Sequence, residues 1–197
     1  MSGSITFYES PFTLYHSGII HDRSRAGLHS VRSEFTIDNS NFSQTVSDAL
    51  SVEFSKGKIS KTAFLDTGMD GIHISGSFLE AEAIVINKVS GRAINADEAS
   101  EANFKDLEID NAKTAVESCD RAKVSIEKIN ISECRNVFIV YQKKPAFGPS
   151  EINVKSFQPG AFKGSYMLEE NSVLTIDGNA LKANREKVAE IVDNDQK

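Results

Sequence analysis

The sequence has few cysteines, no long apolar run and no basic leader, and each absence excludes a class of protein. Its two cysteines, Cys119 and Cys134, are too few for the disulfide framework of a small secreted domain or for a zinc-ligand set. No stretch approaches the roughly 18 apolar residues of a membrane-spanning helix. The start, MSGSITFYES, lacks the basic and apolar segments of a signal peptide. We therefore expect no membrane span, and no signal peptide within the given residues.

The charged residues are mixed rather than grouped by sign. The formal net charge is −6, but Lys and Arg form no stripe and no aromatic residues are interleaved with them, so we expect no nucleic-acid partner. The patterns of phosphate-binding loops, dinucleotide-binding turns, nucleophile elbows, zinc-protease helices and EF-hands are also missing. Nucleotide, nicotinamide, serine-hydrolase and zinc-protease functions are thereby excluded. The length of 197 residues and the hydrophobic content of 40% fit one folded domain.

What the sequence does contain is a 22-residue repeat. Cut before Ala26 and after every further 22 residues, the middle of the chain forms six blocks that align without gaps. The second position is small in five of the six blocks, the fifth is mostly apolar or small, and the third is always apolar. A repeat of this period indicates a solenoid. The third-position residues are Leu28, Leu50, Ile72, Ile94, Val116 and Phe138.

The apolar positions alternate within each block, which indicates a β-strand whose third and fifth positions face inward. A second β-like patch follows later in each block, and Gly, Asn, Asp and Ser lie between the two, as turns require. Coils of about 22 residues with two or three short strands are the unit of a parallel β-helix, which buries its inner face only by stacking. Leucine-rich, helical and β-sandwich architectures do not match this spacing. We therefore predict an all-β, right-handed parallel β-helix.

The flanks extend the predicted solenoid. Residues 4–25 are expected to form a less regular coil, and residues 158–181 one or two closing strands. Residues 183–192 have helical spacing, with Val188 and Ile191 on one face, and are predicted to cap the open end of the core.

These assignments divide the chain into a β-helix at 1–181, with regular coils at 26–157, and a helical cap and tail at 182–197. The N-terminal end shows no comparable cap, and an uncapped end exposes unpaired backbone groups and apolar side chains. We therefore expect further coils or an upstream domain before Met1.

Four segments of the chain resemble a known family. They are Thr6–Phe12 (TFYESPF), Ser47–Phe54 (SDALSVEF), Gly68–Ser77 (GMDGIHISGS) and Tyr141–Pro149 (YQKKPAFGP). They are similar to bacterial right-handed parallel β-helix proteins that are often joined to CotH kinase-like or lamin-tail domains, and the resemblance covers nearly the whole chain. It implies a pectin-lyase-like fold in an extracellular or cell-surface protein, and no particular reaction.

The acidic positions of that family are only partly present in this chain. Asp48 and Asp70 match an acidic position in each of the family's first two motifs, and Glu53 keeps the charge of another. Ser51 and His73 stand where the family has Asp, and the following coil lacks several further acids. These replacements favour a non-catalytic module over an enzyme that needs the full acidic row.

The remaining acids are predicted to gather on one surface. Stacked coils lie about 4.8 Å apart, so equal outward positions of successive blocks form ladders. The first, fourth and sixth positions bring charged residues from three coils onto one patch. Its members are Asp48, Glu53, Asp70, His73 and Asp97.

This patch carries a catalytic hypothesis. An enzyme that acts on uronic-acid polymers must neutralise a carboxylate, remove a proton and protonate the far side. Carboxylate-held Ca²⁺, or a Lys or Arg, supplies the first function, His73 or a Lys is a candidate base, and Tyr141 is a candidate proton donor. Paired acids instead allow glycoside hydrolysis, and adjacent acids raise each other's pKa. On this hypothesis the catalytic residues are Asp48, Glu53, Asp70 and His73, and the substrate-binding residues are Asp97, Tyr141, Lys143 and Lys144.

A structural interpretation accounts for the same residues. Aspartates at strand starts commonly accept hydrogen bonds from backbone amides, and an outward His is commonly solvated or only hydrogen-bonded. The YQKKPAFGP segment is either a Lys-bearing binding loop or a proline-shaped turn with Phe147 against the coil. The sequence therefore favours a non-catalytic module that binds polysaccharide or acts as a rigid scaffold, with a polysaccharide lyase, epimerase or hydrolase as the alternative. No cofactor or metal site is established, although Ca²⁺ is possible at the acidic patch.

Overall fold

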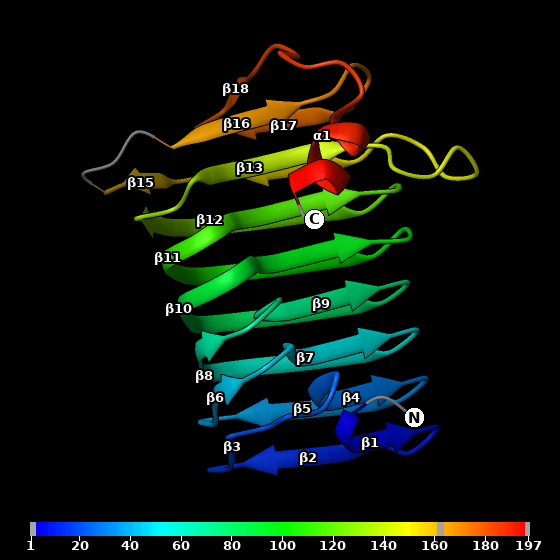
Figure 1. Ribbon diagram of the computed structural model, residues 1–197, viewed down its shortest axis with the longest axis vertical. Coiled ribbons are helices and arrows are strands. Elements are labelled where there is room, and N and C mark those ends of the chain that lie inside the picture. The colour runs from blue at the N-terminus through cyan, green and yellow to red at the C-terminus, as the bar shows by residue number, and fades with distance from the viewer. Residues whose placement is uncertain (1–2, 161–163, 196–197) are drawn as a thin grey trace.

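The computed structural model describes residues 3–160 and 164–195, and within them the chain forms a tall stack of parallel strands (Figure 1). The strands belong to one hydrogen-bonded system of 18 strands, and one helix follows them. The elements are β1 (Gly3–Tyr8), β2 (Phe12–Tyr15), β3 (Gly18–Ile20), β4 (Ala26–Val31), β5 (Glu34–Asp38), β6 (Asn41–Thr45), β7 (Asp48–Glu53), β8 (Lys56–Thr67), β9 (Ile72–Ser75), β10 (Phe78–Asp97), β11 (Glu101–Cys119), β12 (Lys123–Ser132), β13 (Asn136–Tyr141), β14 (Glu151–Val154), β15 (Phe157–Pro159), β16 (Ser165–Leu168), β17 (Val173–Ile176), β18 (Asn179–Ala180) and α1 (Val188–Asp195).

Equal positions of successive blocks pair directly, as the repeat predicts. β4 pairs with β7 at Leu28 and Leu50, and β7 pairs with β9 at Leu50 and Ile72. The row continues through the third positions of β10, β11 and β13, and all of its side chains are buried. Stacking removes these apolar side chains from water, which is the main force that holds a solenoid together. The predicted all-β solenoid with coils of about 22 residues is confirmed.

Each coil bends at corners where one residue adopts a positive φ. In the coil formed by β7 and β8, these residues are Phe54 (φ 49°), Lys61 (φ 47°) and Asp66 (φ 56°). A single left-handed residue redirects the chain without a loop. Strands β8, β10 and β11 therefore continue around a corner, and each coil presents its outward side chains on several separate faces.

An extended segment covers the C-terminal end of the stack. β18 pairs antiparallel with β17. The side-chain Oδ1 of Asn184 accepts a hydrogen bond from the backbone N–H of Leu168 at 3.0 Å, and the backbone N–H of Asn184 donates to the Leu168 carbonyl oxygen, also at 3.0 Å. These bonds satisfy backbone groups that the last parallel strands would otherwise expose. Residues 179–185 thus occupy the place at which the sequence predicted a helical cap.

Helix α1 lies on the side of the stack, in front of β13, and not across its end (Figure 1). Its buried residues Val188 and Val192 pack against Ile139 and Tyr141, which occupy outward positions of β13. The predicted short C-terminal helix is confirmed, but it packs on the side of the stack and not across its end. Ile191, predicted to share the apolar face, is 40% exposed. The reason for this position of the helix is that the outward side chains of β13, Ile139 and Tyr141, are largely apolar. They form a hydrophobic surface on which the apolar face of the helix packs.

Among the described residues, no helix has both the length and the apolar character that crossing a membrane requires. The predicted boundary between a β-helix at 1–181 and a tail at 182–197 stays a prediction. The helix begins at Val188, five residues after the start of the segment in which it was predicted.

Candidate functional site

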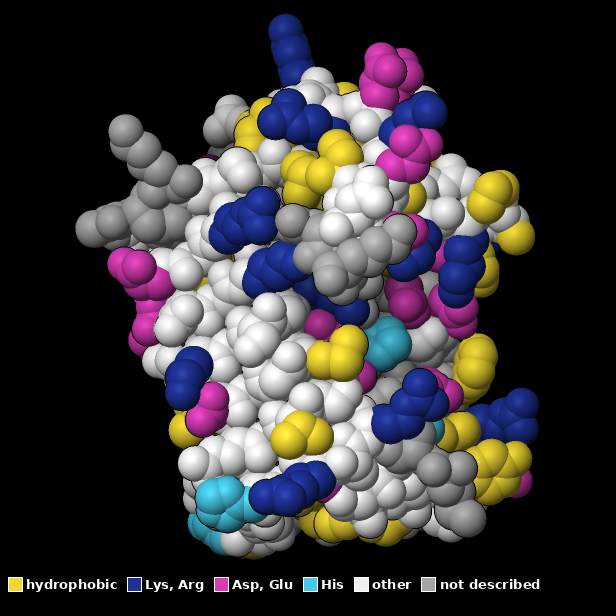
Figure 2. Space-filling view, in the orientation of Figure 1, with side chains coloured by type: hydrophobic (Ala, Val, Ile, Leu, Met, Phe, Trp, Pro, Cys, Tyr) yellow, Lys and Arg dark blue, Asp and Glu magenta, His cyan; other side chains and the backbone are white. Residues whose placement is uncertain are grey.

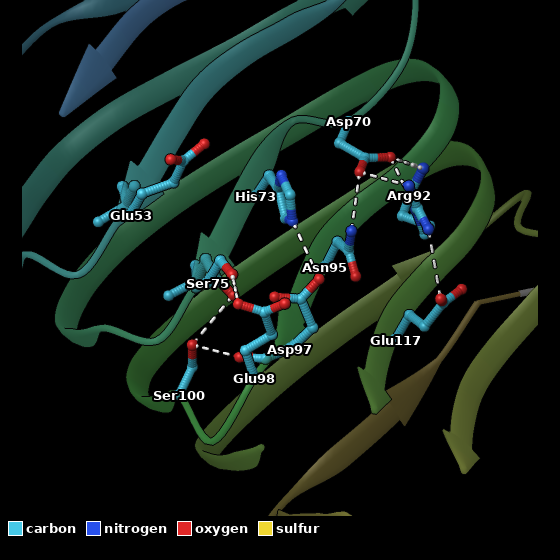
Figure 3. A network of polar contacts seen from close by, with 12 residues as sticks. Glu53, Asp70, His73, Ser75, Arg92, Asn95, Asp97, Glu98, Ser100 and Glu117 are labelled. Atoms are coloured by element: carbon cyan, nitrogen blue, oxygen red, sulfur yellow. Dashed lines mark hydrogen bonds and ion pairs between the residues drawn. The ribbon is translucent and has the colours of Figure 1, made fainter. Parts of the chain in front are cut away.

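The predicted patch lies on the outward side of β7, β9 and the end of β10 (Figure 3). His73 lies between two carboxylates. Its Nε2 is 3.3 Å from Oδ2 of Asp97, and its Nδ1 is 3.9 Å from Oδ2 of Asp48. The His73 side chain is 25% exposed, so this cluster reaches the surface. The three residues come from three successive coils, as the ladders predict.

Burial and mutual charge set the protonation of this cluster. Burial by itself lowers the pKa of His73, but the hydrogen bond to Asp97 and the nearby carboxylates outweigh it, so the pKa of His73 is raised. Burial raises the pKa of Asp97, yet the bond to His73 and its charge prevail and lower the pKa. The pKa of Asp48 is raised, first by burial and then by the neighbouring Asp70. His73 and Asp97 therefore form a charged pair.

Asp70 has every acceptor position of its carboxylate engaged. Oδ1 accepts hydrogen bonds from the backbone N–H and the Nε–H of Arg92 at 3.0 and 2.9 Å. Oδ2 accepts bonds from Nη2 of Arg92 at 2.8 Å and from Nδ2 of Asn95 at 3.1 Å. A carboxylate offers about four such positions, and Asp70 is only 2% exposed. This acid holds two coils together and has no acceptor left for a substrate.

Arg92 links Asp70 to a second buried acid, Glu117. Nη1 of Arg92 lies 3.3 Å from Oε1 of Glu117, which also accepts a hydrogen bond from the Tyr141 hydroxyl at 3.0 Å. Burial raises the pKa of Glu117 despite the Arg92 charge, and burial together with the Glu117 charge raises the pKa of Tyr141. Tyr141, predicted to bind substrate, is fully buried beneath α1 and faces Glu117.

Glu53 lies apart from the His73 cluster (Figure 3). Its Oε1 is 3.0 Å from Nε2 of His29, the residue at the fourth position of the preceding block. Asp48 accepts a hydrogen bond from the backbone N–H of Asp70 at 3.1 Å, which is the geometry of the structural interpretation. The patch therefore assembles only in part, and its catalytic role stays a prediction.

The two predicted lysines are engaged in ion pairs. Nζ of Lys143 lies 3.0 Å from Oδ1 of Asp193 in helix α1. Lys144 pairs with Glu98, and its Nζ lies 5.7 Å from the centre of the Phe147 ring. The face that carries β7, β9 and β13 shows positive and negative side chains interspersed (Figure 2).

Three members of the network were missed by the sequence-based site: Arg92, Asn95 and Glu117. Each stands in a column that the repeat contains, because Arg92 follows Asp70 in the first column and the other two follow His73 in the fourth. A positive residue one block after an acid in the same column was the available signal for an inter-coil ion pair.

Metal binding has no evident ligand set in the described part of the chain. Within residues 3–160 and 164–195, no group of three His, Cys, Asp or Glu side chains is arranged to hold a metal ion. The Asp48, His73 and Asp97 cluster is held together by its own ion pairs. Ca²⁺ binding therefore stays a prediction.

A second surface was not among the sequence predictions. An open groove of about 690 Å³ runs across β5, β8, β10, β11, β12 and β14. It lies on a different face of the coils from the acidic patch, on the strand segments that come after the patch residues in each coil. We call it the lateral groove. Its outward positions stack in register, from Thr36 and Lys58 through Glu80 to Asn103 and beyond.

The comparisons with known proteins bear on the fold. A family model described as a right-handed β-helix region matches residues 17–196. Comparison with curated proteins and with solved structures gave no match. The family match begins just before β3 and spans the coils that follow, the closing segment and helix α1.

Proposed function

This chain belongs to the right-handed β-helix family, and on that premise we propose that it is a non-catalytic module of an exported or cell-surface protein, which binds polysaccharide along a rigid solenoid. One observation carries the proposal. The carboxylate of Asp70, the centre of the acidic patch, accepts four hydrogen bonds and is 2% exposed. Such a group stabilises the stack and has no lone pair free for a proton transfer.

The neighbouring groups support the same conclusion. Neutralising a uronate requires a cation whose charge is not already compensated, but the Arg92 guanidinium pairs with two buried carboxylates. The Tyr141 hydroxyl donates to Glu117 and is out of reach of solvent. Catalysis depends on groups held ready for the transition state, and here those groups are already engaged with one another.

Polysaccharide is the ligand class that suits the scaffold. Successive coils repeat at about 4.8 Å, so an outward ladder offers similar groups at nearly regular intervals along a straight, rigid surface. An extended polymer with repeating units meets such a surface several times at once. Repeated weak contacts along one chain raise the overall affinity without a deep site.

The alternative is a carbohydrate-active enzyme of lyase, epimerase or hydrolase type. It is favoured by one observation, the partly exposed His73 between Asp48 and Asp97. The raised pKa of His73 suits a general acid better than a general base, because more of it is protonated near neutral pH.

The two functions differ in a simple assay. The chain is incubated with neutral and anionic polysaccharides, and unsaturated products and new reducing ends are measured beside polysaccharide binding. We expect binding to at least one polymer and no product, and His73→Gln should leave that binding unchanged. Product formation that His73→Gln abolishes, with the thermal unfolding midpoint and polysaccharide binding preserved, would establish the enzyme and overturn the proposal.

A further inference from the structure

The lateral groove contains a row of polar side chains that make no hydrogen bond or ion pair with the described part of the chain. Asn103 of β11, Ser125 of β12 and Asn153 of β14 occupy paired positions of three successive coils and line the groove. Among the described residues, their side chains make no hydrogen bond or ion pair. In the Asp70 network, by contrast, the polar groups are satisfied between coils. The groove row therefore has donors and acceptors available for a ligand.

The positive and negative charges of the side chains that line the groove balance each other. Three lysines and three glutamates line it, and they form pairs between neighbouring coils. The pairs are Lys58–Glu80 at 3.0 Å, Lys105–Glu82 at 3.2 Å and Lys155–Glu127 at 3.8 Å. A neutral groove on a chain with a formal net charge of −6 offers a polyanion no attraction. An uncharged ligand is not repelled.

The groove lacks the features that bind a peptide. The backbone groups of its strands are already paired on both sides within the stack, so no strand edge is open for an added β-strand. Its one aromatic residue, Phe104, is 1% exposed, so no large apolar or aromatic side chain serves as an anchor. Amide and hydroxyl groups repeating once per coil match the hydroxyl groups that repeat along a sugar chain.

We propose that the lateral groove holds an uncharged, extended polysaccharide, with its sugar hydroxyls on the row formed by Asn103, Ser125 and Asn153. This inference rests on the proposed function and moves its binding surface away from the acidic patch. It also changes the expected ligand, because the patch predicts an anionic polymer and the groove a neutral one.

Affinity electrophoresis of the whole chain tests this assignment. Native gels contain hydroxyethylcellulose, xyloglucan or galactomannan as neutral polymers, and polygalacturonate or alginate as anionic ones. We expect retardation by at least one neutral polymer and a loss of about tenfold or more in its association constant in the double variant Asn103→Ala/Asn153→Ala. Gln158→Ala removes the same kind of amide from an exposed position of β15 outside the groove, and should bind as the unaltered chain does.

The outcomes of this experiment distinguish the assignment of the lateral groove from the proposal that the chain binds polysaccharide at all. Equal thermal unfolding midpoints of the three proteins show that a lost retardation reflects the groove and not the fold. Equal retardation of the double variant and the unaltered chain would overturn the groove while leaving polysaccharide binding in place. Retardation by the anionic polymers alone would overturn the ligand class. No retardation by any polymer would overturn both this inference and the polysaccharide part of the proposed function.

Discussion

The carboxylate of Asp70 and the guanidinium of Arg92 form a two-point pair between adjacent coils, with Nε 2.9 Å from Oδ1 and Nη2 2.8 Å from Oδ2. The planar fork of an arginine matches the two oxygens of a carboxylate, which makes such pairs stronger and more directional than single contacts. The pair lies on the outward side of the strands, yet Asp70 is buried. In this solenoid an outward position is therefore not the same as a solvent-exposed one.

Removal of the Arg92 side chain should destabilise the protein strongly. Arg92→Ala leaves Asp70 and Glu117 buried without a cation, and loss of one partner of a buried pair costs about 3–5 kcal/mol. Arg92→Lys keeps the charge but not the two-point geometry, so its loss should be smaller. Urea unfolding measures both. Lys58→Ala is the control, because its exposed pair with Glu80 is worth about 0–1 kcal/mol. Equal losses for Arg92→Ala and Lys58→Ala would contradict the structural role of Arg92.

The contribution of His73 to the free energy of unfolding should decrease as pH rises. The pKa of His73 is raised in the folded protein by Asp97, Asp70 and Asp48 against the effect of burial. The folded state then holds this proton more tightly than the unfolded state, so the stabilisation is complete below about pH 6.5 and is lost as pH rises through the folded-state pKa. The difference in unfolding free energy between the unaltered chain and His73→Gln should shrink across that range.

The carboxylates beside His73 also make the free energy of unfolding depend on pH, and a second histidine serves as the control. The lowered pKa of Asp97 adds stability above about pH 3.9, and this is lost as pH falls through the folded-state value. The raised pKa of Asp48 acts in the opposite direction. His21→Gln alters an exposed histidine of the first coils and is the control. A difference between the unaltered chain and His73→Gln that does not vary with pH would refute the charged pair.

Helix α1 should detach from the stack when its hydrophobic contact with β13 is disrupted. Val188 is fully buried, and burial of a valine side chain contributes about 1.5–3 kcal/mol. Val188→Asp places a charge in that contact, so protease cleavage within 186–195 should become much faster. Limited proteolysis followed by mass spectrometry measures this. Ile191→Asp alters a residue of the same helix that is 40% exposed, and its cleavage rate should stay near that of the unaltered chain. Equal acceleration in both variants would argue against the observed packing.

A larger residue at Gly57 should destabilise the protein, because the Phe35 ring occupies the space. A Cβ atom on Gly57 would lie 2.1 Å from Cζ of Phe35, whereas one on Gly18 would have its nearest neighbour at 3.5 Å. Overfilling a packed core costs about 1–3 kcal/mol. Gly57→Ala should therefore lower the free energy of unfolding by that amount, and Gly18→Ala should leave it nearly unchanged. Partial recovery in Gly57→Ala/Phe35→Leu, measured by chemical denaturation, would identify the ring as the cause.

The candidate site could be predicted only in part. Columns of the repeat predicted that Asp48, Asp70, His73 and Asp97 come from adjacent coils and lie near one another. They did not show which side chains satisfy each other, because that depends on rotamers and on the distance between coils. Glu53 pairs with the preceding block rather than with His73 for this reason. Tyr141 shares a column with Glu53 and Asp97, but it is buried because a helix from the end of the chain covers that part of the column.

The amino-acid sequence by itself determined the stack. An apolar third position in every 22-residue block has only one way to bury all of its members, which is to place Leu50, Ile72, Ile94 and their equivalents in one file. Only the tertiary structure decided which polar groups remain free for function. Exposure of an outward side chain depends on its neighbours in the coils above and below and on any segment that packs over it. Those neighbours leave Asp70 saturated and Asn103 open, although both occupy outward positions of a strand or its start.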